Sequence, residues 1–342
     1  MHTVTVQPLG RSFKVEEEES VLAAALREGL VLPYSCQSGA CGTCKGRIVS
    51  GSVDYGTYQA RMLTDVEKAA GKALLCQAKP LSDLVIEART VAVGAGIQIK
   101  RLPCRVQKIE RVADDVVILQ LKLPASERLQ FLAGQYIEFL LKDGAKRSFS
   151  VAKPPHAADL IELHVRRVAG GEFTAHVFER MKERDILRFE GPYGTFFLRE
   201  DSGKPIVFVA SGTGFAPVKA VIEDALEKKV ARPMTLYWGG RRPKDLYMNS
   251  LAEGWAQKGL LKYVPVISDA LPEDNWTGRT GFVHRAVMQD FPDLSGHQVY
   301  ACGVPVMVDS ARKDFVEQCR LPEDEFYADS FTTQADVAGV AA

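Results

Sequence analysis

The chain has 342 residues, of which 46% are hydrophobic and 25% charged, as in ordinary globular proteins. Its 43 Lys and Arg balance 43 Asp and Glu, which argues against a bulk nucleic-acid binder, because such proteins need a basic excess to displace counterions. No apolar run approaches the roughly 18 residues of a membrane-spanning helix, and the N-terminus lacks the apolar core of a secretory signal. We therefore expect a cytoplasmic protein of about two to three domains.

The first part of the chain, to about residue 92, mixes strand and helix patterns. Alternating apolar residues predict a strand within 2–9, and a second run at 11–20 leads into the next element. Apolar spacing predicts a helix within 21–30, with Ser20 as its N-cap and Gly29 at its C-terminal end. A connector at 91–101 contains two glycines, which predict either a linker or a short strand edge.

The rest of the chain changes pattern once. From Cys104 to about Leu198, short runs of Val, Ile, Leu and Phe are divided by Gly, Pro and Asp, which favours an antiparallel sandwich or barrel. Residues 172–181 are the one helix candidate there. After about residue 203, strands and helices alternate, as in a doubly wound parallel sheet. This organisation predicts three domains, at 1–92, 101–200 and 203–342.

The cysteines are the strongest chemical signal. An odd count in a chain without a secretory signal is a poor disulfide framework, and four of the seven lie in the first 76 residues. Their spacing, C-x4-C-x2-C and a fourth cysteine after 31 residues, is the plant-type [2Fe–2S] spacing. A structural zinc site, which usually shows two short pairs, and four unrelated core cysteines are the alternatives. The seven are Cys36, Cys41, Cys44, Cys76, Cys104, Cys302 and Cys319.

The segment CQSGACGTCKG followed by Cys76 resembles a plant-type ferredoxin domain, and the resemblance spans residues 1 to about 90. It implies an α+β fold of the β-grasp type. Gly39 and Gly42 would let the backbone fold closely around the cluster and turn N–H groups toward its sulfurs. By the same resemblance, the cluster ligands are Cys36, Cys41, Cys44 and Cys76.

Three further segments together resemble the FAD domain of the ferredoxin–NADP reductase superfamily: RSFS at 147–150, the glycine pair before residue 172, and GPYGTFFL at 191–198. The resemblance implies an antiparallel β-barrel in which Arg147 pairs with the pyrophosphate and Ser150 lies near the reactive flavin edge. Phe149 stands where the family usually has Tyr. For Arg147, a surface salt bridge is the alternative. The other implied cofactor contacts are Ser148, Phe149, His164, Val165, Gly171, Glu172, Phe173 and Thr174.

The strand–turn–helix at 205–226 carries a G-x-G-x-x-P turn, where a phosphate-bearing ligand can approach the backbone. With YACGVPVM at 300–307 it resembles the NAD(P) domain of the same superfamily. This implies that Thr213 and Cys302 flank the nicotinamide, an ordinary buried cysteine being the alternative for Cys302. The implied nucleotide contacts are Gly212, Thr213, Gly214, Pro217, Cys302, Gly303 and Pro305.

The adenosine end of the nucleotide is expected at 236–247. Arg241 and Arg242 are either readers of a 2′-phosphate or solvated side chains, and the segment WGGRRPKDLY is similar to NADH-using relatives, so we expect NADH, with NADPH as the second choice. Phe331 is a candidate for stacking on the flavin, with ordinary packing as the alternative. Residues 335–342 are expected to be mobile.

The three motif sets together predict electron transfer from NADH through FAD and a [2Fe–2S] cluster to a partner protein. The domain order resembles the reductases of bacterial aromatic-ring oxygenases and multicomponent hydroxylases, and within that set the CDP-6-deoxy-glucoseen reductase-like proteins. That resemblance implies an oxygenase or hydroxylase component, or a pyridoxamine-phosphate-dependent dehydrase, as the electron acceptor. The alternative is a self-contained NAD(P)H flavin or ferric reductase. Neither nucleic acid nor a membrane is expected as a partner.

Overall fold

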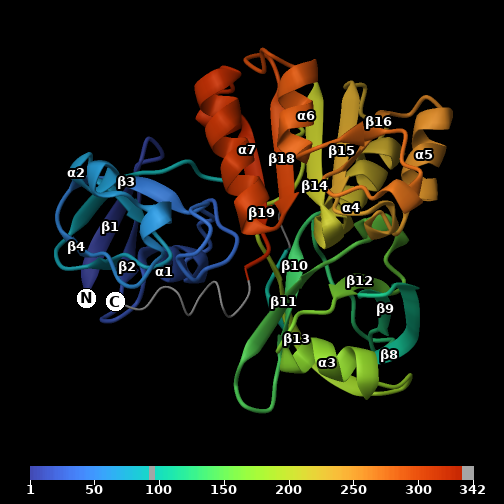
Figure 1. Ribbon diagram of the computed structural model, residues 1–342. Coiled ribbons are helices and arrows are strands. Elements are labelled where there is room, and N and C mark those ends of the chain that lie inside the picture. The colour runs from blue at the N-terminus through green and yellow to red at the C-terminus, as the bar shows by residue number, and fades with distance from the viewer. Residues whose placement is uncertain (92–96, 333–342) are drawn as a thin grey trace. The chain divides into compact units, whose positions relative to one another are not determined.

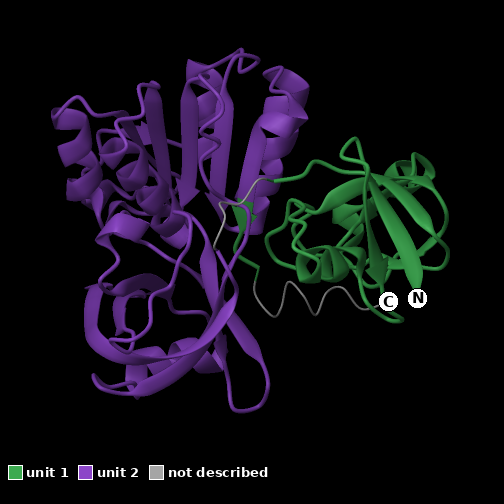
Figure 2. Cartoon of the chain, turned by 180° about the vertical axis from the view of Figure 1, so that it is seen from behind, with its two compact units in different colours: residues 1–95, 329–342 green, residues 96–328 purple. Residues whose placement is uncertain are grey.

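The structure is a computed structural model that describes residues 1–91 and 97–332. It divides into two units, one of residues 1–95 with 329–342 and one of residues 96–328 (Figure 2). The middle of the predicted connector at 91–101, and the tail at 335–342, lie outside the described residues. Within the described ranges, every helix is too short or too polar to cross a bilayer.

The first unit is built on a five-stranded mixed sheet. β1 runs antiparallel to β2 but parallel to β7, and β3 runs antiparallel to both β7 and β5. α1 (Val21–Arg27) begins as predicted at Ser20, whose Oγ accepts the N–H of Ala23 at 3.2 Å. In spatial order the strands are β2 (Arg11–Val15), β1 (His2–Gln7), β7 (Leu84–Glu87), β3 (Lys45–Ser50) and β5 (Lys72–Leu74). Smaller elements are β4 (Val53–Asp54), β6 (Lys79–Pro80), η1 (Ala60–Met62) and α2 (Asp65–Ala69).

The first half of the second unit is a six-stranded antiparallel sheet that is strongly curved (Figure 1). Its edge strands, β11 (Lys146–Ser150) and β12 (Ile161–Arg166), approach each other through one isolated bridge, from Val151 to Leu163. Alternate side chains of the strands meet in one apolar cluster, which α3 (Glu172–Glu179) covers with Phe173 and Val177. In spatial order the strands are β11 (Lys146–Ser150), β10 (Tyr136–Leu140), β13 (Ile186–Tyr193), β8 (Lys100–Ala113), β9 (Val116–Lys122) and β12 (Ile161–Arg166).

The second half is a parallel sheet in which the chain runs outward from β14 and then returns to β18 on its other side. The strand order therefore reverses between β14 and β18, and ligands of such sheets bind at the carboxyl ends of the strands at that point. The strands in spatial order are β17 (Arg279–Thr280), β16 (Lys262–Ile267), β15 (Met234–Gly240), β14 (Ile206–Ser211), β18 (Gln298–Gly303) and β19 (Phe326–Ser330).

Helices bury both faces of this sheet. α6 (Val283–Asp290) and α7 (Pro305–Gln318) pack on Val207 and Val209 of β14. On the other face, α4 (Phe215–Glu227) begins with a phenyl ring stacked on Trp238 at 3.8 Å between centroids, and α5 (Asn249–Gln257) adds Trp255. Because successive strand residues point to opposite faces, both faces of β14 are apolar, as in a buried parallel strand.

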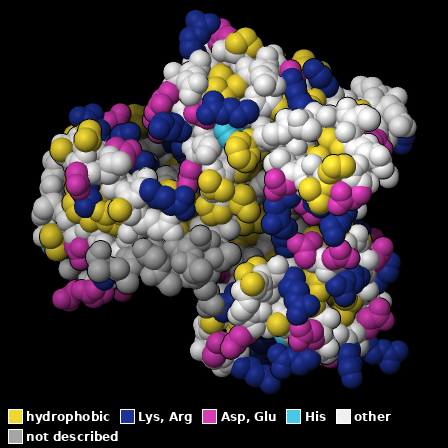
Figure 3. Space-filling view, in the orientation of Figure 1, with side chains coloured by type: hydrophobic (Ala, Val, Ile, Leu, Met, Phe, Trp, Pro, Cys, Tyr) yellow, Lys and Arg dark blue, Asp and Glu magenta, His cyan; other side chains and the backbone are white. Residues whose placement is uncertain are grey.

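Acidic and basic side chains lie interspersed over the visible surface of both units (Figure 3). This distribution agrees with the equal counts of the two signs in the sequence.

We predict that two glycines of positive φ in the second unit differ sharply in their tolerance of alanine. A Cβ on Gly134 (φ +100°) would lie 2.0 Å from the carbonyl oxygen of Phe196, whereas a Cβ on Gly144 (φ +82°) would meet open space. Gly144→Ala should therefore cost only the backbone strain of about 1–2 kcal/mol, and Gly134→Ala should cost about 3 kcal/mol or more. Denaturant unfolding followed by tryptophan fluorescence measures both, since all three tryptophans lie in this unit. Equal losses would contradict the close approach.

Candidate functional site

The four cysteines of the ferredoxin-like segment come together in the first unit as two pairs. The thiol of Cys36 contacts that of Cys41, and the thiol of Cys44 contacts that of Cys76. Cys36 is half-buried and the other three are buried, and none is in a disulfide. A two-iron cluster needs two thiolates on each iron, so this two-by-two arrangement fits a [2Fe–2S] centre.

The backbone around the thiols also fits a cluster. The amide of Ser38 donates to Cys36 Sγ at 3.4 Å, and the side-chain amide of Gln77 donates to Cys76 Sγ at 3.7 Å. Such donors offset the negative charge of a cluster. The adjacent Cys41 thiol, followed by Ser38, lowers the pKa of Cys36 to about 6, and the same contact raises the pKa of Cys41.

Glycine is required in this loop, as predicted. Gly39 (φ +74°) and Gly42 (φ +71°) both adopt left-handed backbone conformations. A Cβ on Gly39 would lie 2.7 Å from the carbonyl oxygen of Thr57. Among the described residues, no group of three His, Cys, Asp or Glu side chains is arranged around one metal ion.

The predicted flavin-binding residues lie mainly on the edge strand β11 and on α3. Arg147 is half-buried, and its Nη1 donates to the carbonyl of Lys146 at 2.8 Å. The Ser148 hydroxyl donates to Glu138 at 3.2 Å, and Ser150 is buried opposite Tyr136 of β10. The ends of this strand therefore differ, with Arg147 accessible to a phosphate and Ser150 directed into the protein.

Phe149 takes a packing role. Its ring lies 5.8 Å from that of Phe139 and 5.5 Å from that of Phe173, between centroids. The substitution of Phe for the Tyr usual in the family therefore keeps an apolar contact between β11 and α3.

The N-terminus of α3 is open to a ligand. Gly171 occupies the N-cap position and has no side chain to bond the first N–H groups. The Thr174 hydroxyl accepts the N–H of Val168 at 3.2 Å and donates to the carbonyl of Gly171 at 3.0 Å. The amides of Glu172 and Phe173 lie in the first turn of the helix, at the positive end of its dipole. Phosphate groups bind at such helix starts.

His164 and Val165 point in opposite directions from β12. Val165 lies in the apolar cluster of the sheet, whereas His164 lies on the other face, with Nδ1 2.8 Å from Tyr247 Oη and Nε2 3.3 Å from Glu162 Oε1. Both ring nitrogens are thus engaged, so a cofactor contact at either residue would come from the backbone. Since a carboxylate only accepts, Nε2 carries the hydrogen and the Tyr247 hydroxyl donates to Nδ1.

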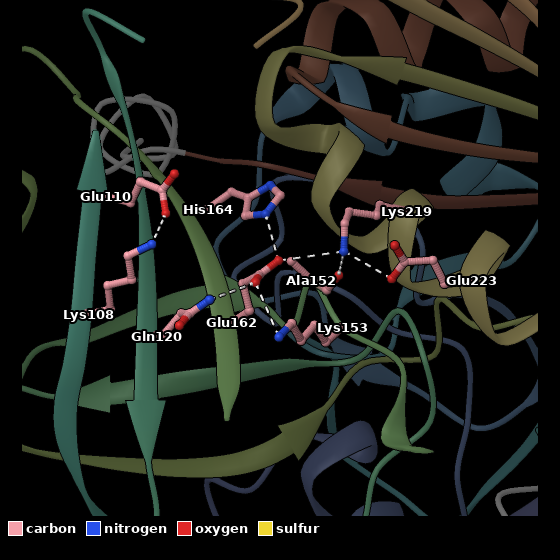
Figure 4. A network of polar contacts seen from close by, with 9 residues as sticks. All are labelled: Lys108, Glu110, Gln120, Ala152, Lys153, Glu162, His164, Lys219 and Glu223. Atoms are coloured by element: carbon pink, nitrogen blue, oxygen red, sulfur yellow. Dashed lines mark hydrogen bonds and ion pairs between the residues drawn. The ribbon is translucent and has the colours of Figure 1, made fainter. Parts of the chain in front are cut away.

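Glu162 is the centre of a polar network between the two halves of the second unit (Figure 4). It also lies 3.5 Å from Lys219 Nζ and 3.6 Å from Lys153 Nζ. Burial by itself would raise its pKa, but the hydrogen bond from His164 and the charge of Lys219 hold the pKa of Glu162 at about 2. The carboxylate is therefore charged at neutral pH. Of these partners, the sequence analysis singled out His164 but neither Lys219 nor Lys153.

The two nucleotide motifs interlock at the carboxyl ends of β14 and β18. A Cβ on Gly214 would lie 2.1 Å from the carbonyl oxygen of Cys302, and a Cβ on Gly303 (φ +146°) would lie 2.1 Å from Ser211 Oγ. Ser211 Oγ accepts the N–H of Val304 at 3.2 Å. Segments about 90 residues apart thus form one backbone surface at the sheet's switch point.

The predicted nicotinamide residues line this surface or lie beneath it. Thr213 is 7% exposed and Cys302 is fully buried, while Pro217 and Pro305 lie in the first turns of α4 and α7. The N-cap position of α4 is Gly214, which offers no side-chain cap, but the amide of Phe215 already donates to the carbonyl of Gly212, and Pro217 has no N–H to donate.

Arg166 is a site residue that motif reasoning missed. Its Nη1 lies 2.8 Å from the position of a Cβ on Gly212, and its Nε donates to Asp115 Oδ2 at 2.7 Å. The carbonyl of Gly212 also accepts the indole N–H of Trp238 at 3.1 Å. A cation therefore lies beside the glycine-rich turn.

At the predicted adenosine end, the two arginines differ. Arg241 is exposed, whereas Arg242 donates to both oxygens of Asp274, at 2.6 and 2.8 Å, and also to Glu273 at 3.4 Å. Arg242 holds the pKa of Asp274 below its usual range. Phe331, the predicted flavin-stacking residue, is half-buried directly after β19.

Comparison with known families matches each part of the chain. A 2Fe-2S iron-sulfur cluster binding domain matches residues 4–81, an oxidoreductase FAD-binding domain residues 103–198, and an oxidoreductase NAD-binding domain residues 208–313.

Relatives match over nearly the whole length. A CDP-6-deoxy-L-threo-D-glycero-4-hexulose-3-dehydrase reductase from Yersinia pseudotuberculosis is 42% identical over 96% of this chain and 98% of its own. A phenol hydroxylase P5 protein from Acinetobacter pittii is 37% identical over 98% and 96%. A crystal structure of an Amycolatopsis cytochrome P450 reductase is similar with a TM-score of 0.77 and 34% identity, over 97% and 99%.

We predict that His164 makes the second unit less stable in mild acid. Burial lowers the pKa of His164 below its ordinary 6.5, with Glu162 opposing and Lys219 adding to the effect. The unfolded chain therefore takes up a proton first, and stability falls as pH drops below about 6.5, by at most about 1.4 kcal/mol per pH unit for one proton. Denaturant unfolding between pH 7 and 5 should show a smaller loss for His164→Gln. Burial also lowers the pKa values of His284 and His297, but these residues are present in the parent protein and in the variant, so their effect cancels in the comparison. Equal losses of stability with falling pH in the parent and in His164→Gln would contradict the role given to His164.

Proposed function

Because this chain belongs to the family of NAD(P)H-dependent iron–sulfur flavoprotein reductases, we propose that it prefers NADH and passes electrons to a partner protein of the dehydrase or oxygenase type. The observation that carries the proposal is the presence of the three matched domains, in this order, in one chain. Its general activity follows from the family: it is an oxidoreductase that moves electrons from NAD(P)H by way of FAD and a [2Fe–2S] cluster.

The bound groups supply the redox chemistry, since a nicotinamide delivers two electrons together and the cluster carries one at a time. The chain supplies binding and orientation. We assign the cluster to Cys36, Cys41, Cys44 and Cys76, which the structure brings together in pairs.

The flavin and nucleotide assignments rest on the residue types of the motifs and on the interlocked glycine-rich turn. We assign a diphosphate to Arg147 and the start of α3, because a guanidinium and the N–H groups of a helix start both bind phosphate. Ser150, Thr213 and Cys302 are assigned to the region where the nicotinamide meets the flavin, since Thr213 and Cys302 belong to the interlocked turn. The isolated Val151–Leu163 bridge supports closure of the antiparallel sheet into a barrel around this region.

The preference for NADH rests on Arg242. A guanidinium bonded to both oxygens of Asp274 has few donors left for a 2′-phosphate, and the adjacent Glu273 repels that group. The 2′-phosphate of NADPH would therefore meet an arginine whose charge the carboxylates of Asp274 and Glu273 already balance.

The partner is proposed from the relatives. One is named as the reductase of a hexulose dehydrase and another as a phenol hydroxylase protein, at 42% and 37% identity. The first name describes the reductase of a dehydrase, and the second a protein of a phenol hydroxylase. We propose a separate acceptor protein of one of these types here, in preference to a self-contained flavin or ferric reductase.

The electron route predicts a spectroscopic result. Anaerobic NADH should bleach the flavin of the purified protein and produce the EPR signal of a reduced [2Fe–2S] cluster. Cys76→Ala should abolish the signal and the reduction of a protein acceptor such as cytochrome c, while NADH still bleaches the flavin and ferricyanide is still reduced. Cys319→Ala is the control, because Cys319 is buried and lies outside the ferredoxin-like segment. This variant should keep both the EPR signal and the reduction of cytochrome c. Full cytochrome c reduction by Cys76→Ala would favour the self-contained reductase.

Coenzyme choice predicts a second result. Asp274→Asn removes the charge that neutralises Arg242 but keeps an oxygen for the N–H of Leu271. The ratio of kcat/KM for NADPH to that for NADH should rise about tenfold, equivalent to about 1.4 kcal/mol. Steady-state reduction of ferricyanide measures it. Adding Arg242→Ala to the variant should reverse the gain, and an unchanged ratio would show that this pair does not read the 2′-position.

A further inference from the structure

Lys219 is a cation buried between the two halves of the second unit. Only 4% of the residue is exposed, although it lies in the second turn of α4. Its Nζ donates to the carbonyl of Ala152 at 3.0 Å and to Glu223 Oε2 at 3.0 Å, and lies 3.5 Å from Glu162 Oε1 (Figure 4). Two of these three acceptors belong to the flavin half, so the lysine connects the start of the nucleotide helix to the other half.

The acceptors lie close to the predicted reaction centre. Ala152 follows Ser150 by two residues, and its N–H donates to the carbonyl of Glu162 at 2.8 Å. Lys219 follows the glycine-rich turn, since Gly214 is the N-cap of its helix. The ammonium group of Lys219 therefore bonds a segment two residues from Ser150, the predicted flavin contact. The same lysine lies on α4, the helix that follows Thr213, a predicted nicotinamide contact.

The outward face of β12 continues the same connection. Ile161, Leu163 and Val165 point into the apolar cluster of the antiparallel sheet. The alternate residues point to the nucleotide half, where Glu162 meets Lys219, His164 meets Tyr247, and Arg166 reaches Gly212. Every outward residue of this strand thus contacts a different part of the nucleotide half.

Stability alone is a poor explanation for the lysine. A buried ion pair often contributes no more than apolar side chains of similar volume, because both charges lose their hydration. The flanking residues Val218, Ala220, Val221 and Ile222 are apolar and buried, so this part of α4 is already packed without the lysine. A directional bond to one carbonyl and one carboxylate restricts the helix to a single position, which apolar contacts do less strictly.

We propose that Lys219 is a positioning residue for flavin reduction: by bonding Ala152 and Glu162, it fixes the glycine-rich turn at residues 212–214 against the flavin half. This inference rests on the proposed function. In the reaction, NADH gives up a hydride, two electrons and one hydrogen nucleus, and becomes NAD⁺, while the flavin takes up the hydride and a proton from water and is reduced by two electrons. Lys219 takes no part in the bond changes and sets only the approach of the two groups.

The test is rapid mixing of NADH with the FAD-loaded full-length protein without oxygen, comparing Lys219→Met with the parent. A misplacement of about 1 Å can cost about a hundredfold in rate. We therefore expect the limiting rate of flavin reduction at saturating NADH to fall at least tenfold, while the NADH concentration for half the limiting rate changes less than threefold. An unchanged limiting rate with full FAD content would overturn the proposal.

Two variants on the same helix separate position from charge. Lys228→Met removes a lysine that pairs with Glu200 and Asp224 and is 43% exposed, and it should keep the parent rate. Glu223→Gln changes the acceptor that lies on α4 itself, so it leaves the connection to the flavin half intact and should also keep most of the rate. A loss in Glu223→Gln equal to that in Lys219→Met would show that buried charge matters rather than position.

A readout without NADH checks position directly. Amide hydrogen exchange of residues 212–216 in the oxidised protein should be faster in Lys219→Met than in Lys228→Met, and equal exchange would contradict the proposal.

If Lys219→Met fails to fold, the double variant Lys219→Met/Glu223→Gln is used. It removes the charge of Glu223, which would otherwise lose its lysine partner, and Glu162 keeps Lys153 and His164. The same loss of rate is expected there, and a parent-like rate would overturn the proposal. Should NADH fail to reduce the flavin of the parent protein, the proposed function is wrong, whatever the variants do.

Discussion

The nucleotide half depends on a place where two loops meet closely at their glycines. Gly214 lies against the carbonyl of Cys302, and Gly303 lies against Ser211, so that a Cβ at either glycine would approach to 2.1 Å. Parallel strands bring their carboxyl ends to one edge of the sheet, and these glycines let the two loops at that edge merge into one surface. The glycine-rich turn and the start of α4 lie at that surface, and the nucleotide assignments follow from it.

The flavin half meets this surface through a strand with two different faces. The inward side chains of β12 belong to an apolar cluster, and the outward ones are a carboxylate, an imidazole and a guanidinium. Such polar groups are costly to bury unless each has a partner. Tyr247, Lys219 and Asp115 supply those partners from both halves. The geometry between the halves is thereby set by directional bonds.

Local chemistry explains what the sequence could predict. The cysteine spacing, the glycine-rich turn and the Cys–Gly–x–Pro segment each lie within a few residues, and the family comparison confirms the three domain types they indicated. Alternating strands and the caps of α1 followed from the same short-range patterns. The patterns gave no prediction for α2, α5 or α6, which are short helices of five, nine and eight residues.

The polar network could not be predicted in this way. Glu162 and Lys219 are 57 residues apart, and Arg242 and Asp274 are 32 apart. No spacing rule joins such pairs, because the fold alone brings them together. In the sequence alone, each is one charged residue among 86. The pairing also decides the role of Arg242, which by sequence is either a reader of a 2′-phosphate or a solvated side chain and in the fold is held by carboxylates.

The position of Lys219 also limits which parts of such reductases can be exchanged by recombination. By sequence it belongs to the nucleotide half, yet two of its three bonding partners belong to the flavin half. A recombination that exchanged one half for that of a distant relative would separate the lysine from its acceptors. The two halves of the second unit are therefore expected to pass through evolution as one inherited block, and chimeras designed from them must carry residues 152, 162 and 219 together.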